Sequence, residues 1–485
     1  MSKSKATTSI FWNFFCTYGR TMITFIVTVV LARYLRPADF GLMTIIVALS
    51  AVSSIFTDAG FTQALIQADA VNKKQQSTVF LINTFIGILL YVALYVLSPF
   101  LCTTFDAGEQ ILLMRLAFLA VLFDALGVLP CAMLQKTLEF KQYSIAQMIG
   151  TGIASVCAVF IAICGGGCYA LVANFTLYSV LRTLFFWFFY ANFPGIHFSF
   201  RGIKKLFYFS SYMMAYNVFD RLMTTLEAAF IGKMFSKSAL GFYSKTKELS
   251  AVPTQELCQV IMKVIFPFVV SDKNNNLVLQ RRYRFFTSVI FYLISCFAVC
   301  IFLSAEEIVI IVLGEQWKES AIFLRCWCIY GFFFPLETIG INILMVIGRV
   351  KLILLLQVIR WFFRILGFLL VYIVAKSVLG SILAIITVSS VFCVIFIYYG
   401  GRQIGYVLKE IIDDTWYIIF ICLVSGGLAI AGNMILYTSS HWGNAIIKTL
   451  IFGTSFLMLS YLFKEKIPEE FFLFLTSLRK KILSF

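Results

Sequence analysis

Polar and charged residues recur at helical spacing inside strongly apolar segments of this chain. The first segment carries Asn13, Thr17, Arg20 and Thr24 at steps of four, three and four residues, which places all four on one face of a helix. An arginine at the centre of a membrane span costs about 2.5–3.5 kcal/mol on insertion scales, so it usually faces a bundle interior or a water-filled cavity. Guanidinium groups bind phosphate oxygens through two parallel hydrogen bonds. The spacing therefore predicts a site for an anionic group.

Stripes of the same kind recur in both halves of the chain, as at Gln147, Thr151 and Ser155. Basic residues within the apolar segments outnumber acidic ones, and a net positive cleft of low dielectric favours an anion. The expected substrate is a large amphiphile with a phosphate or diphosphate group. The candidate residues of this cationic site are Arg20, Arg221, Arg182, Arg360, Arg364, Lys245, Lys247, Asn13 and Asn217.

Three carboxylates in the same segments are candidates for coupling transport to an ion gradient, namely Asp58, Asp220 and Glu227. For the basic residues there is an alternative interpretation, in which each is a paired structural group or reaches toward an interface. This alternative applies most to Arg182, Lys245, Lys247 and Arg364, which lie near the ends of their segments.

The composition indicates the environment of these residues. Of 485 residues, 61% are hydrophobic and 13% are charged, whereas soluble domains carry about 45–50% and about 25%. Mean hydropathy is +0.93. These values exclude a soluble enzyme, a disordered protein and a disulfide-stapled secreted domain. The 13 cysteines lie mostly in apolar runs, and two histidines make a metal centre unexpected. We expect no metal, no cofactor and no catalytic residues.

The chain is expected to be an all-α polytopic membrane protein with about 14 transmembrane helices, since each span needs about 20 mostly apolar residues. The seventh and eighth spans are weak in hydropathy because polar residues interrupt them. The expected spans are 10–32, 40–62, 77–101, 110–134, 144–163, 169–191, 207–231, 240–268, 285–304, 320–346, 352–374, 378–399, 415–437 and 443–463.

Lysine and arginine in the connections indicate the orientation. With the N-terminus in the cytoplasm, inner segments hold 22 of these residues and outer loops hold 6. This asymmetry predicts that both termini are cytoplasmic. Membrane topology thus explains most of the net charge of +16, and no nucleic-acid partner is expected.

Two helix-loop-helix corners resemble each other. Leu35-Arg36-Pro37-Ala38-Asp39-Phe40-Gly41-Leu42 and Phe235-Ser236-Lys237-Ser238-Ala239-Leu240-Gly241-Phe242 share a bulky residue, a polar turn and a glycine, at an offset of 200 residues. Chance similarity is the alternative. The corners predict two pseudo-symmetric six-helix lobes with the same topology, and a site between them. The expected parts are an N-lobe at 1–191, a cytoplasmic linker at 192–206, a C-lobe at 207–400, and two C-terminal helices with a basic tail at 401–485.

Several motifs in this chain resemble those of a known family. The first corner, beginning at Ala32-Arg33-Tyr34, resembles the "LAR-LGP-DFG" corner after the first helix of bacterial polysaccharide flippases. Further similar segments are Asp58–Gln67, Glu227–Gly232 followed by Ala239–Ser244, Leu313–Trp317, and Gly348–Lys351. The resemblance covers nearly the whole chain. It is to the O-antigen and exopolysaccharide flippases of the multidrug/oligosaccharidyl-lipid/polysaccharide exporter superfamily.

The resemblance implies alternating access between two lobes and transfer of undecaprenyl-diphosphate-linked oligosaccharide from the cytoplasmic to the periplasmic leaflet of the bacterial inner membrane. In related lipid II flippases, basic residues of the central cavity are required, and Arg20 matches their first-helix arginine by helix. Two C-terminal helices form a groove for the lipid tail in those relatives. Family members often have Asp where Glu227 stands, which leaves the role of Glu227 open. Membrane lipids, a polymerase or glycosyltransferase complex, and protons or sodium ions are the other expected partners.

Two other functions are considered. A multidrug or cation antiporter of the same superfamily would have a cavity rich in acidic and aromatic residues, and the excess of buried Arg and Lys argues against it. A membrane polymerase or ligase usually has a large periplasmic loop, and an O-acyltransferase has an intramembrane His. This sequence shows neither feature, so we expect a transporter and not an enzyme.

Overall fold

The described part of the chain is entirely helical. The structure, a computed structural model, describes residues 3–58, 62, 65, 72–105, 108, 110–137, 139–192, 194–195, 211–259, 261–262, 276–436, 438 and 440–463, without the side chains of 3–15, 17–18, 58, 211–217 and 276. These residues form fifteen α-helices and no strand, which confirms the predicted fold class.

The chain divides into two compact units, Met1–Gly241 and Phe242–Phe485. The boundary follows the second of the two corners, so the helix that precedes this corner belongs to the first unit. The predicted lobes at 1–191 and 207–400 stay a prediction.

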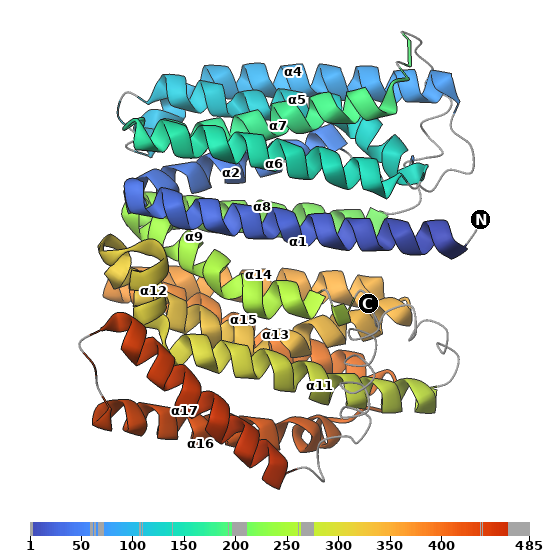
Figure 1. Cartoon of the computed structure of the whole chain (residues 1–485). Helices are drawn as coiled ribbons and strands as arrows, with labels where there is room; N and C mark the ends of the chain where they lie inside the picture. The colour runs from blue at the N-terminus through green and yellow to red at the C-terminus, as the bar shows by residue number, and fades with distance from the viewer. Residues whose placement is uncertain are drawn as a thin grey trace. The chain divides into compact units, whose positions relative to one another are not determined.

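The first unit is a bundle in which α5 lies between α4 and α7, while α6 packs on both α7 and α1 (Figure 1). A second seam joins α2 to α8. Its helices are α1 (Lys3–Tyr34), α2 (Pro37–Asp58), α4 (Lys73–Thr104), α5 (Ile111–Lys136), α6 (Phe140–Ile163), α7 (Tyr169–Tyr190) and α8 (Ser211–Met234).

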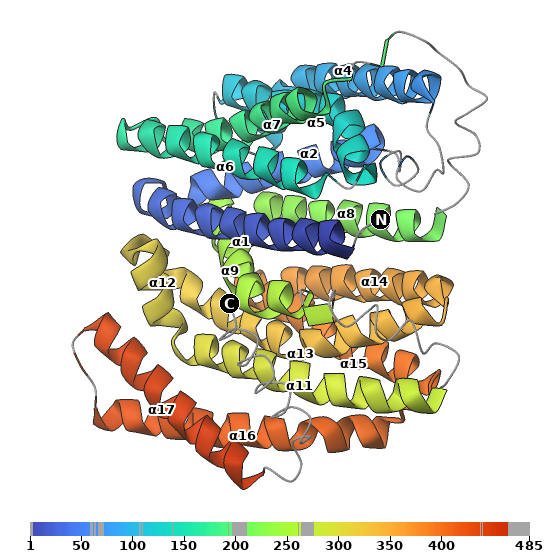
Figure 2. The same cartoon turned by 45° about the vertical axis from the view of Figure 1, so that its right-hand side comes forward.

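The second unit is built around α13, which packs on α15 and α11, while α16 covers the other side of α11 (Figure 2). Helix α9 starts at the end of the first unit and continues into the second. The elements are α9 (Lys237–Ala251), a π-helical turn η2 (Val252–Glu256), α11 (Asn276–Leu303), α12 (Ala305–Leu313), a 3₁₀ turn η3 (Glu315–Ser320), α13 (Ala321–Val346), α14 (Val350–Ala375), α15 (Val378–Arg402), α16 (Leu408–Ile435) and α17 (His441–Leu462).

Eleven segments of the described residues are long and apolar enough to cross a membrane. They comprise α2, α4, α5, α6, α7, α11, η3 with α13, α14, α15, α16 and α17. Helices α1, α8 and α9 coincide with the first, seventh and eighth predicted spans and are not among the eleven.

The described surface exposes many large apolar side chains, as a protein in a lipid bilayer does. Large apolar side chains are exposed along whole helix faces, as at Phe85, Val92 and Val96 on α4. In water such a continuous apolar face would be an association surface, whereas in a bilayer it is the normal exterior. The chain is a multi-pass membrane protein.

Local sequence signals fix where some helices begin. The backbone N–H of Asn72 donates to the side chain of Gln75 at 3.0 Å, which closes a capping box at the start of α4. Ser377 caps α15 by accepting from the backbone N–H of Gly380 at 3.2 Å. These caps satisfy orphan backbone groups at the helix ends, where the chain leaves the apolar layer.

Candidate functional site

Arg20 is held by uncharged groups from two other helices of the first unit. Its Nη1 donates to Oε1 of Gln147 on α6 at 2.6 Å and to the hydroxyl of Tyr178 on α7 at 3.2 Å. Helix α1 packs on α6, and α6 packs on α7, so these three polar side chains meet inside the bundle. Neither of these acceptors carries a negative charge, so both orient the guanidinium without cancelling its charge.

A polar pocket of about 230 Å³ opens beside this guanidinium. It is lined by Cys16, Arg20, Gln135, Phe140, Tyr143, Ser144 and Gln147. The volume exceeds several-fold the roughly 30 Å³ that one water occupies in the liquid. A pocket with one fixed guanidinium, two amides and two hydroxyls offers donors for an anionic or heavily hydroxylated group.

Arg182 of α7 belongs to the same region and is paired. Its Nη2 lies 2.6 Å from Oδ1 of Asp124 on α5, and its guanidinium lies 5.1 Å from the ring centroid of Tyr178. Tyr178 therefore contacts both arginines: its hydroxyl accepts from Arg20, and its ring lies near the guanidinium of Arg182. Because Asp124 balances Arg182, the positive charge of this region comes from Arg20.

The second unit contains a separate buried cluster between α13, α14 and α15. Arg360 forms an ion pair with Oε1 of Glu337, and both side chains are 6% exposed. Oε2 of the same carboxylate accepts from the Tyr330 hydroxyl at 3.1 Å and from the Cys393 thiol at 3.3 Å. The guanidinium of Arg364 lies 4.1 Å from the Trp361 ring centroid. Glu337 thus binds one arginine of α14, while the other arginine of α14 contacts an aromatic ring.

The other predicted lysines have separate contacts. Lys245 forms an ion pair with Glu248 at 2.6 Å. The Nζ of Lys247 lies 5.0 Å from the ring centroid of Trp327 and 5.6 Å from the ring centroid of Tyr243. Both lysines lie on α9, and cation–π contacts of this length stabilise a charge in a low-dielectric setting.

Helix α8 carries three further candidates. Arg221 is exposed, Asp220 is half-buried and Glu227 is buried. Asn13 on α1, Asn217 on α8 and Asp58 on α2 lie on helices whose bounds are described, but their side chains lie outside the described ones. The structure thus joins Arg20 with Arg182 in the first unit, and Arg360 with Arg364 in the second.

Glu337 is the residue that sequence reasoning missed as part of a site. It is the one acidic residue in α13, and α14 carries two arginines four residues apart. The sequence signal for such a pair is a single acidic residue in one apolar helix and arginines in the following helix. No group of three or more His, Cys, Asp or Glu that could hold a metal ion occurs among the described residues.

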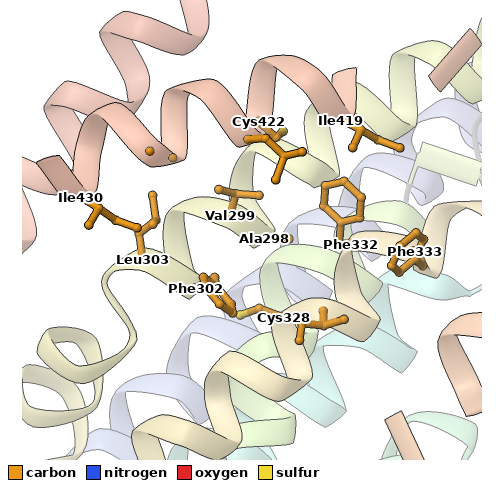
Figure 3. Close-up of a pocket in the computed structure, with 14 residues that line it drawn as sticks. Ala298, Val299, Phe302, Leu303, Cys328, Phe332, Phe333, Ile419, Cys422 and Ile430 are labelled. Carbon is orange, nitrogen blue, oxygen red and sulfur yellow. The ribbon is translucent and has the colours of Figure 1, made fainter. Parts of the chain in front are cut away.

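An apolar pocket of about 520 Å³ lies between α11, α13 and α16 of the second unit. Figure 3 shows Val299 and Phe302 of α11, Phe332 of α13, and Cys422 of α16 around it. The remaining lining residues are also apolar or small: Ala298, Leu303, Cys328, Ile329, Phe333, Ile419, Leu423, Gly426, Gly427 and Ile430. Such a surface suits a hydrocarbon chain.

An ion-pair cluster joins two of the helices that line this pocket. Arg284 of α11 contacts Glu410 and Asp414 of α16 at 2.9 Å each. Next to these helices, Lys448 of α17 pairs with Glu307 of α12, and both side chains are at most 15% exposed. The α11 and α16 walls of the pocket are therefore held to each other by charged groups.

Known proteins are similar to this chain. A family model described as polysaccharide biosynthesis protein matches residues 30–322. Teichuronic acid biosynthesis protein TuaB of Bacillus subtilis is 25% identical over 366 residues, which cover 74% of this chain and 73% of that protein. Lipopolysaccharide biosynthesis protein WzxC of Escherichia coli is 23% identical, with 62% of each chain covered. Succinoglycan biosynthesis transport protein ExoT of Rhizobium meliloti is 22% identical, with 65% of this chain and 64% of that protein covered.

Solved structures share the fold at low sequence identity. The lipid II flippase MurJ in an inward closed conformation gives a TM-score of 0.73 at 12% identity and covers 94% of this chain and 99% of its own. An inward-facing multidrug resistance MATE family transporter gives 0.62 at 15% identity, with 80% and 96% covered.

Proposed function

We infer the function of this chain from one premise: it belongs to the polysaccharide biosynthesis protein family. We propose that it flips undecaprenyl-diphosphate-linked oligosaccharide, an O-antigen or exopolysaccharide repeat unit, from the cytoplasmic to the periplasmic leaflet by alternating access. The relatives whose names describe polysaccharide biosynthesis or transport support this proposal. It places the protein in the bacterial inner membrane with both termini in the cytoplasm.

The observation that carries the proposal is Arg20 beside a polar pocket inside a bundle of membrane helices. A diphosphate and its sugars cannot cross hydrocarbon unaided, because each desolvated polar group costs several kcal/mol. A guanidinium oriented by the neutral groups of Gln147 and Tyr178 replaces part of the hydration of a phosphate. We assign the first contacts of the headgroup to Arg20, together with Arg221 and the other predicted basic residues.

The apolar pocket between α11, α13 and α16 supports the other half of the proposal. A polyprenyl tail stays in hydrocarbon during transfer, and a pocket of about 520 Å³ lined by apolar side chains offers it a lateral seat. Helix α16, the first of the two C-terminal helices, then contributes to the groove for the lipid tail that the resemblance to lipid II flippases implies. Asp58, Asp220 and Glu227 stay the candidates for proton or sodium coupling, with Asp58 outside the described side chains.

The experiment uses purified protein in liposomes that contain undecaprenyl-diphosphate-linked oligosaccharide with a reducible fluorophore on its sugar. An impermeant reductant bleaches only the outer leaflet in liposomes without protein. We expect the whole fluorescence to be bleached when the protein is present, because label from the inner leaflet reaches the outside. Arg402→Ala, which removes an exposed arginine at the end of α15, serves as a control with unchanged bleaching.

Two results would replace the proposal. Movement of ethidium across the same liposomes without movement of the lipid would identify a cation antiporter. Transfer of radiolabelled sugar from the lipid to a new acceptor would identify an enzyme of polymerase or ligase type.

A further inference from the structure

The two corners of the predicted repeat touch each other through their backbones. A Cβ atom built on Gly41 would lie 1.8 Å from the carbonyl oxygen of Lys237, and one on Gly241 would lie 2.0 Å from the carbonyl oxygen of Pro37. The contact is reciprocal, because each corner offers a glycine to the carbonyl at the first helical position of the other. All four residues belong to the unit Met1–Gly241.

Local hydrogen bonds place the two glycines at equivalent positions. In the first corner the Asp39 side chain accepts from the backbone N–H of Arg36 at 3.0 Å. In the second corner the Ser236 hydroxyl oxygen accepts from the backbone N–H of Ala239 at 3.0 Å. Each bond fixes the start of its helix. Each glycine is consequently the fifth residue of its helix, α2 or α9.

Only glycine allows this approach. Real Cβ atoms essentially never lie within 3.0 Å of another heavy atom, and the atoms opposite are backbone, which cannot rotate away as a side chain can. The contact between α2 and α8 continues beyond the two corners. The Thr225 hydroxyl on α8 donates to the carbonyl of Ala48 on α2 at 3.1 Å.

We propose that Gly41 and Gly241 form a latch that closes the outer end of the transport path and that separates when the headgroup is released. The inference rests on the proposed function, whose orientation puts both corners on the periplasmic side. At these two positions the latch consists of the Cα atom of each glycine against the carbonyl oxygen of the other corner. Such a contact is specific in shape and contains no ion pair, so it can be broken and remade in each cycle.

A native thiol lies beside both corners of the latch, since it contacts Asp39 and is within the influence of the Lys237 charge, and it serves as the reporter of latch opening. Cys168 is 5% exposed, and its thiol donates to the carbonyl of Asp39 at 3.8 Å. Burial raises the pKa of this thiol to about 12, so the closed corner suppresses its reaction, which requires the thiolate. Cys164, four residues earlier, is exposed and labels without regard to the latch.

The test measures labelling by an impermeant maleimide in right-side-out vesicles. The unaltered protein shows whether Cys164 reacts from the outside, which checks the orientation. A Cys164→Ser background then isolates Cys168. Overpacking of a close contact shifts a closed-to-open ratio by about ten-fold to a hundred-fold. We expect Gly41→Ala and Gly241→Ala each to raise the labelling rate of Cys168 by that factor and to reduce export.

Gly152 provides the matched control, because it lies within α6 of the same unit and a Cβ there meets no atom within 4 Å. Gly152→Ala should leave the Cys168 rate unchanged. If either latch variant fails to fold, Thr225→Val loosens the same seam without adding bulk and should raise the rate several-fold. A rate equal to that of the parent in folded Gly41→Ala or Gly241→Ala protein, or in Thr225→Val, would show that the corners are a static contact and overturn the proposal.

The experiments distinguish a failure of the latch proposal from a failure of the proposed function. Lipid flipping in liposomes together with a Cys168 rate that ignores both glycine substitutions would remove the latch and keep the flippase. A rate that responds to the substitutions in a protein that flips no lipid-linked oligosaccharide would do the reverse.

Discussion

Arg284 of α11 holds Asp414 of α16 through two parallel hydrogen bonds, from Nε to Oδ2 at 3.0 Å and from Nη2 to Oδ1 at 2.9 Å. The remaining Nη1 donates to Glu410 at 2.9 Å. Tyr406 adds a hydroxyl donor to Asp414 at 2.8 Å. Burial and the carboxylate of Asp414 raise the pKa of Tyr406, so this donor stays protonated at physiological pH.

Loss of the two parallel hydrogen bonds from Arg284 to Asp414 should weaken the packing of α16 on α11. Hydrogen bonds to charged groups contribute about 1.5–3 kcal/mol each when buried, and Arg284 is 38% exposed, so we expect Arg284→Ala to cost about 1–2 kcal/mol in total. Arg284→Lys keeps the charge without the fork and should recover only part of the stability. Thermal unfolding of the purified protein measures both, and an apparent Tm equal to the parent's for Arg284→Ala would contradict the prediction.

Removal of the guanidinium at Arg20 should abolish polymer export while protein level is kept. Its two hydrogen-bond acceptors, Gln147 and Tyr178, are neutral, so Arg20→Ala strands no opposite charge and should not unfold the protein. We expect the same loss of export for Arg221→Ala, which removes an exposed charge on α8. Surface polysaccharide and immunoblots of the membrane fraction measure the two quantities. Normal polysaccharide in both variants would refute the cationic site.

Filling the apolar pocket should reduce flipping without unfolding the second unit. Gly427 lines the pocket, and a Cβ there meets no atom within 4 Å, so Gly427→Leu adds bulk without a clash at that position. Gly453 on α17 is equally open and does not line the pocket, which makes Gly453→Leu the matched control. We expect a several-fold lower flipping rate for the first variant only. Equal flipping rates in the two variants would show that the lipid tail does not occupy this pocket.

The ion pair between Glu337 and Arg360 should behave as one unit in a double-mutant cycle. Removal of one partner from a buried pair costs about 3–5 kcal/mol, because it leaves an uncompensated charge. Arg360→Met should therefore destabilise the protein strongly, and the addition of Glu337→Gln should restore much of the loss. Thermal unfolding of the four proteins measures the coupling. Additive effects would mean that the pair makes no net interaction.

Polar residues that share a helical face in the sequence lie together in the first unit. Arg20 and Gln147 come from two predicted stripes, and the structure joins them, together with Tyr178, through two hydrogen bonds. Periodicity was sufficient because each stripe must face away from lipid, and few interior faces exist in a small bundle. The resemblance in the corner motifs was carried by glycine positions, whose backbone contact is now visible.

Pairing between distant helices was not predictable in the same way. Arg284 and Asp414 are 130 residues apart, and their contact depends on which helices are neighbours. The stretch from Glu248 to Gln259 shows a second cause. It contains the π-helical turn Val252–Glu256, which holds an extra residue per turn. A helical period of 3.6 residues therefore does not predict which residues after Pro253 share a face with those before it.

The ion pairs of α16 and α17 have a thermodynamic consequence for a flippase. Arg284 with Asp414 joins α11 to α16, which both line the apolar pocket, and Lys448 with Glu307 joins α17 to α12. A hydrocarbon chain that stays against α11 and α16 while they keep their ion pair changes little in solvation free energy during transfer. The work of each cycle then falls mainly on the hydrophilic end of the cargo.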